Sequence, residues 1–212
     1  MTPDKGPGFG AETFQRNAGV SRETLDRLAL YHDLLQKWAP AINLVGKESL
    51  SDAWRRHFWD SAQVFSLLPP PPPSRALRLV DLGSGAGFPG LVLAIMGAVE
   101  VHLVESDMKK CSFLREAARI TGTEVTIWNR RIEGVEPLHA DVVTARALAP
   151  LARLIGLAKL HLKPTGLGIF LKGRGVEQEL TAIPKGATLV VDKFPSRSDP
   201  DSTILVVGGI SG

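Results

Sequence analysis

The chain has 212 residues, of which 44% are hydrophobic and 22% are charged, and this balance excludes a disordered or fibrous protein. A single cysteine, Cys111, excludes an internal disulfide and a cysteine-based zinc cage and is typical of a reducing compartment. With a formal net charge of +3 the protein is not a polycation, so any nucleic acid must be bound by a local basic patch. The longest uncharged run, Leu82–Val99, is broken by glycines and a proline and does not predict a membrane span. We therefore expect a cytoplasmic protein.

The first part of the chain has a helical pattern. Apolar residues recur at helical spacing from Ser21, a suitable N-cap, to Trp38, and a second helical pattern covers residues 54–68. The five prolines of Pro69–Pro73 then fit neither a helix nor an interior strand and predict a stiff linker. We expect an N-terminal helical extension over residues 1–73 and a second domain over residues 74–212.

After the prolines, short apolar runs alternate with helical patterns. This alternation predicts an α/β fold with a mostly parallel, doubly wound, Rossmann-like sheet, and two final strands predict an antiparallel hairpin at one edge. The expected strands cover residues 77–82, 101–104, 125–128, 141–145, 168–171, 187–191 and 203–207, and the expected helices cover residues 91–96, 108–121 and 151–162.

A glycine-rich loop lies between the first expected strand and the first expected helix. Its last part, Gly85–Gly90, fits the dinucleotide fingerprint, in which a ligand approaches the backbone. However, Asp81 would repel a pyrophosphate, whereas it suits the cationic amino-acid end of S-adenosylmethionine. Glu105 ends the second strand, 22 residues after Gly83, where a carboxylate accepts from a ribose diol. The loop therefore favours S-adenosylmethionine over a dinucleotide; a tight turn beside an exposed acid is the purely structural alternative.

Several short motifs occur in a fixed order around this loop. They are Ile42–Gly46, Arg56–Ser61, Asp81–Gly90 with its Gly-Phe-Pro-Gly ending, Glu105 followed by Lys109 and Lys110, and Arg146-Ala147. In this order they resemble the bacterial 16S ribosomal RNA guanine-N7 methyltransferase family, formerly called glucose-inhibited division protein B, from about residue 25 to about residue 175. The resemblance implies a class I methyltransferase fold, S-adenosylmethionine as the cofactor, and methylation of N7 of one guanine, position 527, in the 530 loop of 16S ribosomal RNA.

The loop and the resemblance together define an expected cofactor site. The residues themselves indicate Asp81, Gly85, Gly87 and Glu105. The resemblance adds Gly83, Phe88, Ile132, Glu133 and Arg146. Arg146 stays open between the carboxylate of the cofactor, an RNA phosphate and a structural salt bridge, since a guanidinium holds any of these.

The expected RNA contacts are less specific. They are Asn43, Arg56, His57, Lys172 and Arg174. Each also has a structural interpretation, and Arg56, His57 and Asp60 are at least as well suited to tie the N-terminal helices to the sheet.

No catalytic residue and no metal is expected, because guanine N7 carries a free lone pair and needs no general base. Two other functions stay open: a nicotinamide-dependent oxidoreductase and a non-catalytic RNA-binding protein of ribosome assembly. The expected partner is 16S ribosomal RNA, free or within the 30S subunit, and we expect a monomer.

Overall fold

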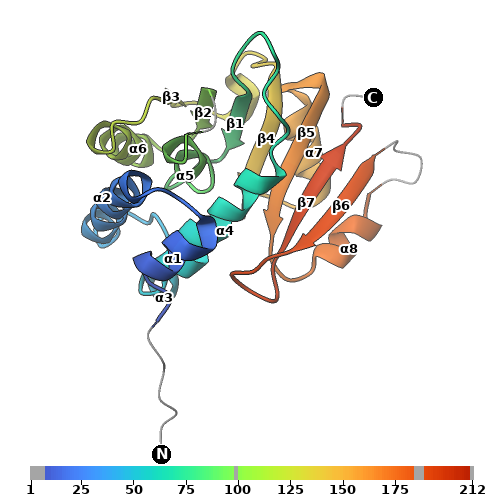
Figure 1. The fold of residues 1–212 in the computed structure, drawn as a ribbon. Coiled ribbons are helices and arrows are strands. Elements are labelled where there is room, and N and C mark those ends of the chain that lie inside the picture. The colour runs from blue at the N-terminus through green and yellow to red at the C-terminus, as the bar shows by residue number, and fades with distance from the viewer. Residues whose placement is uncertain (1–7, 98–99, 184–188, 211–212) are drawn as a thin grey trace, which may run out of the picture.

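The computed structural model describes residues 8–97, 100–183 and 189–210, and within them seven strands form one twisted sheet (Figure 1). Its strand order is β3-β2-β1-β4-β5-β7-β6, with β1 to β5 parallel and β7 antiparallel to both β5 and β6. The doubly wound sheet with an antiparallel edge hairpin is therefore confirmed. The strands are β1 (Arg78–Leu82), β2 (Glu100–Val104), β3 (Thr126–Trp128), β4 (Ala140–Arg146), β5 (Leu162–Lys172), β6 (Val190–Pro195) and β7 (Thr203–Gly208).

Burial explains which strands the sequence predicts well. The central strand β4 is buried from Ala140 to Ala145, as parallel strands covered on both faces are, so it is a continuous apolar run. The edge strand β6 is mostly exposed and carries Asp192 and Lys193, so its pattern is weak. It lies at Val190–Pro195 rather than at the predicted 187–191, of which residues 187 and 188 lie outside the described residues.

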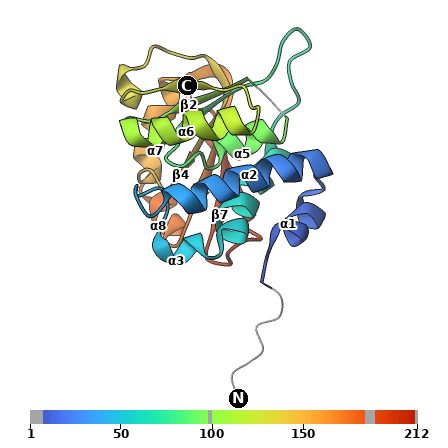
Figure 2. The ribbon, with the colours of Figure 1, turned by 90° about the vertical axis from the view of Figure 1, so that its left-hand side faces the viewer.

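Helices cover both faces of the sheet. The N-terminal helices, α5 and α6 share one hydrophobic core, and α7 and α8 belong to a second core on the opposite face. Figure 2 shows α2 running alongside α6, where Arg27 Nε donates to the carbonyl oxygen of Thr121 (2.7 Å). The helices are α1 (Ala11–Ala18), α2 (Arg22–Trp38), α3 (Lys47–Leu50), α4 (Asp60–Ala62), α5 (Gly90–Ile95), α6 (Met108–Ile120), α7 (Leu151–Lys159) and α8 (Val176–Thr181). Over the described ranges, none of them has both the length and the apolar surface needed to span a bilayer.

The expected helix over residues 54–68 is not a single α-helix. It consists of a π-helical turn η1 (Trp54–Trp59), the short α4, and a 3-10 turn η2 (Gln63–Leu67). Single π-helical turns such as η1 are frequent at functional sites. Here η1 and α4 carry His57 and Asp60, both of which line a cavity at the end of the sheet.

The N-terminal helices are not an independent unit, because they pack directly on the glycine loop. Tyr31 of α2 is fully buried, its ring stacks on Phe88 (5.3 Å between centroids), and its hydroxyl donates to the carbonyl oxygen of Ala86. Gly87 has no Cβ, and one added there would stand 2.8 Å from the Tyr31 hydroxyl and 2.9 Å from Leu91 Cβ. Residues from both sides of Pro73 share one core. The division into two domains at Pro73 therefore stays a proposal.

The proline run ends at an ion pair that attaches it to the sheet. Arg75 donates two hydrogen bonds to the buried carboxylate of Asp141 (2.7 and 2.9 Å) at the start of β4. The backbone nitrogen of Arg78 donates to the same carboxylate (2.8 Å), and Lys163 also pairs with it. Burial alone would raise the pKa of Asp141, but these hydrogen bonds hold it well below its usual range. The linker is thus fixed at the end of the sheet remote from the glycine loop.

The packing at Gly87 predicts a specific cost for a larger side chain. Gly87 (φ +96°) and Gly97 (φ +93°) have nearly equal φ angles, but a Cβ at Gly97 meets nothing within 4 Å. We expect Gly97→Ala to cost about 1 kcal/mol through backbone strain alone, and Gly87→Ala to cost about 1–3 kcal/mol more through overpacking against Tyr31. Urea unfolding of both variants measures the difference, and equal losses would show that the α2 contact does not constrain this position.

Candidate functional site

Two cavities open at the carboxyl ends of the parallel strands, of about 520 and 670 Å³. They lie where the strand order reverses between β1 and β4, which is where open α/β sheets bind ligands. We call them the first and the second cavity. They share one wall, formed by Gly83, Gly85, Lys110, Arg146 and Ala147.

The second cavity is formed by the ends of β1, β2 and β4 and by the turn η3 (Ile132–Gly134). Glu105 lies at its edge next to the shared wall, and Ile132 and Glu133 line it on the side of η3. These are three of the residues that the sequence predicts for cofactor binding, now brought together with Gly83 and Gly85.

Glu105 holds the glycine loop as well as lining the cavity. Its Oε2 accepts from the backbone nitrogen of Gly85 (2.9 Å), and its Oε1 accepts from that of Asp107 (2.8 Å). Gly85 itself has φ +57°, and a Cβ there would meet only the carbonyl oxygen of Gly83, at 3.8 Å. A side chain at this position would therefore project into the space of the cavities.

Two predicted cofactor residues do not line either cavity. Asp81 is fully buried beneath the loop, where it accepts from Thr144 Oγ1 (2.7 Å) and from the backbone nitrogen of Gly90 (3.3 Å). Burial raises its pKa to about 6, and these hydrogen bonds oppose that shift. Gly87 faces the N-terminal helices, as described above. The sequence places both at the loop correctly, and in this structure they support it from behind; a contact of either with the cofactor stays a prediction.

The first cavity lies between η1, the glycine loop and the ends of β5 and β7. Arg146 extends from β4 across the ring of Phe88, with Cζ 4.9 Å from the ring centroid. Its Nη1 donates to His57 Nδ1 (2.9 Å) and to the carbonyl oxygen of Arg56 (3.2 Å), and stands 3.9 Å from Asp60 Oδ2. His57 stacks on the same Phe88 ring (5.1 Å). The guanidinium thus joins the sheet to the N-terminal helical segment.

These contacts fix the protonation state of His57. A guanidinium can only donate, so Nδ1 of His57 is an acceptor and its proton lies on Nε2, which donates to Ser49 Oγ (3.0 Å). Burial, with Arg146 and Arg56 nearby, lowers the pKa of His57 to about 3. His57 is therefore a neutral positioning group at physiological pH.

The far wall of the first cavity comes from the loop between β6 and β7. Ser196 and Ser198 are buried there, and both hydroxyls donate to Asp60 Oδ1 (2.9 and 2.7 Å). Gln63 Oε1 accepts from the backbone nitrogen of Arg197 (2.7 Å) in the same loop. The C-terminal hairpin and the N-terminal helices thus meet across this cavity.

Comparison with known proteins decides the family. A family model described as "GidB: rRNA small subunit methyltransferase G" matches residues 24–198. The chain belongs to this family. It is 57% identical over 203 residues to a protein named "Ribosomal RNA small subunit methyltransferase G" from Paramagnetospirillum magneticum, with 96% of this chain and 97% of that protein covered. A protein of the same name from Rhodospirillum centenum is 54% identical, with 97% and 93% covered.

Solved structures confirm the class I methyltransferase fold. A SAM-dependent methyltransferase from Aquifex aeolicus matches with a TM-score of 0.57 at 15% identity, covering 76% of this chain and 95% of that one. The enzyme TYW2 from M. jannaschii in complex with AdoMet matches with a TM-score of 0.54 at 14% identity, covering 80% and 77%. The family and fold expected from the sequence are both confirmed.

The predicted RNA contacts divide into three groups in this family member. Arg56 and His57 line the first cavity, and Arg56 is 3.7 Å from Asp199. Lys172 also lines it, but its buried ammonium is paired with Glu179 (2.7 Å) and donates to the carbonyl oxygen of Ala149 (2.9 Å). Its charge is therefore already satisfied inside the protein. Asn43 and Arg174 are exposed and line neither cavity.

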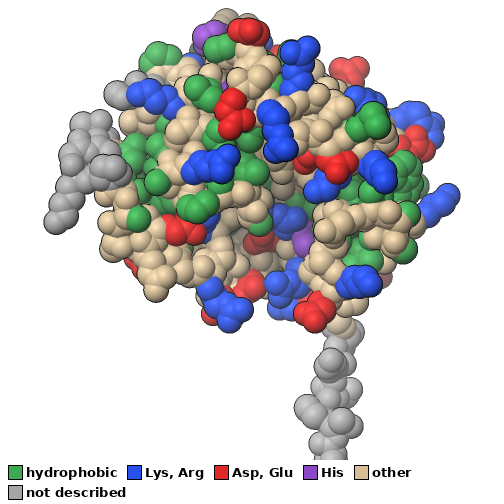
Figure 3. All heavy atoms as spheres, turned by 180° about the vertical axis from the view of Figure 1, so that it is seen from behind, with side chains coloured by type: hydrophobic (Ala, Val, Ile, Leu, Met, Phe, Trp, Pro, Cys, Tyr) green, Lys and Arg blue, Asp and Glu red, His purple; other side chains and the backbone are tan. Residues whose placement is uncertain are grey.

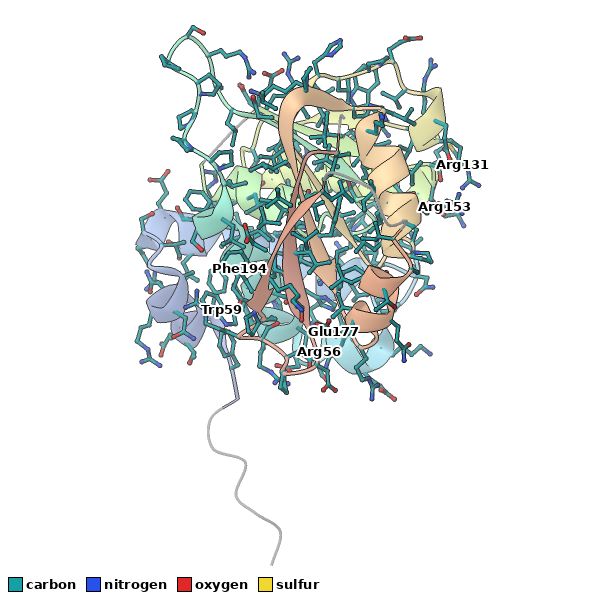
Figure 4. All side chains as sticks on the ribbon, turned by 90° about the vertical axis from the view of Figure 1, so that its right-hand side faces the viewer. Arg56, Trp59, Arg131, Arg153, Glu177 and Phe194 are labelled. Carbon is teal, nitrogen blue, oxygen red and sulfur yellow. The ribbon has the colours of Figure 1, made fainter. Side chains whose placement is uncertain are left out.

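A basic rim also lines the second cavity, and of its residues only Lys110 belongs to the motifs described above. Lys110, Arg130, Arg131 and Arg153 line the second cavity, from α6, the end of β3 and α7. Figure 4 shows Arg131 and Arg153 projecting outward next to each other, and Lys and Arg side chains gather around a hollow on the face seen in Figure 3. The adjacent pair Arg130-Arg131, one residue after the end of β3, was the available signal; Arg153 could be placed there only by the fold.

The buried state of His57 predicts a pH-dependent stability. Below pH 6.5 the unfolded chain binds a proton at this residue that the folded protein excludes. The contribution of neutral His57 to the free energy of unfolding is therefore lost as pH falls from about 6.5 toward 3. At pH 5 this loss amounts to about 2 kcal/mol. In His57→Asn, Oδ1 can still accept from Arg146, and the stability gap between wild type and variant should shrink by about that amount between pH 7.5 and pH 5.

Chemical denaturation at several pH values measures this gap. Asp81 titrates in the same range but is unchanged in the variant, so it cancels from the difference. Parallel pH profiles for the two proteins would show that His57 takes up its proton normally in the folded state.

Proposed function

We propose that this chain transfers the methyl group of S-adenosylmethionine to N7 of guanine 527 in the 530 loop of 16S ribosomal RNA. The observation that carries the proposal is the pair of cavities on either side of one glycine-loop wall, in a chain of this family. One cavity suits a nucleoside with a ribose diol, and the other suits a planar base beside Phe88.

In this proposal the cofactor occupies the second cavity. Glu105 accepts from the ribose hydroxyls through the lone pairs that Gly85 and Asp107 leave available, and the segment of Ile132 and Glu133 lies beside the adenine. Arg146, on the shared wall, holds the carboxylate of the methionine part. Gly83, Gly85 and Phe88 shape the passage between the cavities, while Asp81 and Gly87 hold the loop from behind.

The base enters the first cavity with N7 toward the shared wall. The N7 lone pair forms the bond to the methyl carbon, and the electrons of the methyl–sulfur bond return to sulfur. The products are S-adenosylhomocysteine and a cationic N7-methylguanine, and no proton moves in this step. The neutral, doubly hydrogen-bonded His57 suits this chemistry, because no general base is needed. Catalysis is then mainly orientation of the two reactants.

The topology favours this reaction over the nicotinamide alternative. In the dinucleotide-binding sheet the strand order is 3-2-1-4-5-6. Here β7 is inserted antiparallel between β5 and β6, which is not the dinucleotide-binding order.

The basic rim supports an RNA substrate. Arg130, Arg131 and Arg153 are placed to meet phosphates at the mouth of the second cavity, together with Lys110, and Arg56 is placed to do so at the first. We propose that the enzyme acts as a monomer in the cytoplasm on 16S ribosomal RNA, either free or within the 30S subunit.

Loss of one modification tests the function in cells. Mass spectrometry of 16S ribosomal RNA from a strain lacking the gene should show unmethylated guanine at position 527, and the intact gene should restore N7-methylguanine there. A non-catalytic assembly protein would leave the modification unchanged, and so would any enzyme with another substrate.

Gly85 tests the position of the cofactor. Gly85 (φ +57°) and Gly122 (φ +58°) have nearly equal φ angles, and a Cβ at Gly122 meets nothing within 4 Å. Both valine variants carry similar strain, but only Gly85→Val fills space in the shared wall. We expect Gly85→Val to abolish binding of S-adenosylmethionine in calorimetry and Gly122→Val to bind like wild type. Wild-type affinity in a folded Gly85→Val protein would place the cofactor elsewhere.

A further inference from the structure

We propose that Asp60 recognises the acceptor guanine, by accepting a hydrogen bond from N1–H on its Watson–Crick edge. This inference rests on the proposed function, since it assigns the specificity of the same site. It concerns a residue that neither the glycine loop nor the expected RNA contacts include.

Asp60 lines the first cavity and keeps one carboxylate oxygen that can still accept a hydrogen bond. The residue is 9% exposed and lines that cavity. Its Oδ1 already accepts from Ser196 Oγ (2.9 Å) and Ser198 Oγ (2.7 Å), which uses both lone pairs of that oxygen. Its Oδ2 stands 3.9 Å from Arg146 Nη1, which is beyond hydrogen-bonding distance, so Oδ2 keeps its capacity to accept.

The surroundings of Asp60 hold its side chain in one orientation. The two serine hydroxyls come from the loop between β6 and β7, and Gln63 binds both Ser196 Oγ (3.2 Å) and the backbone nitrogen of Arg197 (2.7 Å). Arg55 Nη1 donates to the carbonyl oxygen of Ser198 (3.3 Å). A recognition group must be held by such supporting contacts to discriminate between ligands.

A carboxylate here matches guanine and opposes adenine. Guanine presents two donors, N1–H and N2–H, on this edge, whereas adenine presents the lone pair of N1. The oxygen O6 lies between N1 and N7, so a base whose N1–H meets Asp60 can turn N7 toward the shared wall beside Arg146. A site built to hydrogen-bond one group strongly rejects an analogue that lacks it.

The charge of Asp60 also suits the reaction. Transfer of the methyl group moves positive charge from sulfur onto the purine, and this charge makes N1–H a stronger donor. A fixed carboxylate on that edge is therefore bound more strongly by the transition state than by the neutral base. An amide at the same place would lose this gain.

The test couples one protein atom with one substrate atom. Asp60→Asn keeps an oxygen for the two serine hydroxyls but replaces the free acceptor with a donor. The substrates are 16S ribosomal RNAs that carry either guanosine or 2-aminopurine riboside at position 527. The 2-aminopurine base lacks N1–H and O6. Each RNA is tested free and within reconstituted 30S particles. The control variant is Asp26→Asn, whose carboxylate binds Arg22 on an exposed face of α2 and lines neither cavity.

We expect Asp60→Asn to lower kcat/KM on guanosine RNA by about 10- to 150-fold, the loss of one charge-assisted hydrogen bond, with unchanged affinity for S-adenosylhomocysteine. On 2-aminopurine RNA the variant should differ from wild type by less than about threefold. Asp26→Asn should leave the preference between the two substrates unchanged. Equal losses on both substrates, or no loss on guanosine, would overturn the assignment.

Wild-type enzyme alone gives a second readout if Asp60→Asn does not fold. It should methylate guanosine RNA, and RNA with inosine, which keeps N1–H, at least tenfold faster than RNA with 2-aminopurine riboside, which lacks N1–H. Equal rates on all three would show that this edge is not recognised. If wild type methylates none of them, the proposed function itself fails, which is a different result.

Discussion

The site depends on a glycine loop whose backbone must be open to a ligand on one side and immobile on the other. Three side chains from three different elements provide this support. Glu105 after β2 accepts from the nitrogen of Gly85, Tyr31 of α2 donates to the carbonyl oxygen of Ala86, and Asp81 of β1 accepts from the nitrogen of Gly90. Each contact replaces a hydrogen bond that water would otherwise make to the loop. The loop is therefore preorganised before any ligand arrives.

A second constraint links the N-terminal helices to the sheet through the same loop. Phe88 packs between Tyr31, His57 and the guanidinium of Arg146, so one ring of the loop contacts both parts of the chain. Because His57 is buried and accepts from Arg146, the histidine stays neutral, and the positive charge remains where the two cavities meet. In our account this charge binds the cofactor carboxylate on one side and lies near the carboxylate of Asp60 on the other.

Much of the fold was predictable because its central strands and its loop are local patterns. The strands of the parallel sheet are apolar runs, and the glycines, Phe88 and Glu105 stand at fixed spacing from them. The roles of Asp81, Gly87 and Lys172 were not predictable in this way, since burial beneath the loop, contact with Tyr31 and pairing with Glu179 depend on distant segments. The place of Asp60 in the first cavity likewise depends on serines more than 130 residues away. The basic rim is divided among three elements and has no common sequence pattern.

A crystal structure with S-adenosylhomocysteine bound tests the central claim most directly, because the account assigns each cavity a different ligand. It predicts the nucleoside in the second cavity, with the ribose hydroxyls on Glu105, the adenine beside Ile132, and the carboxylate on Arg146. The first cavity should then remain open beside Phe88 and Asp60. Density for the nucleoside in the first cavity, or a bound product that makes no contact with the shared wall, would contradict the account.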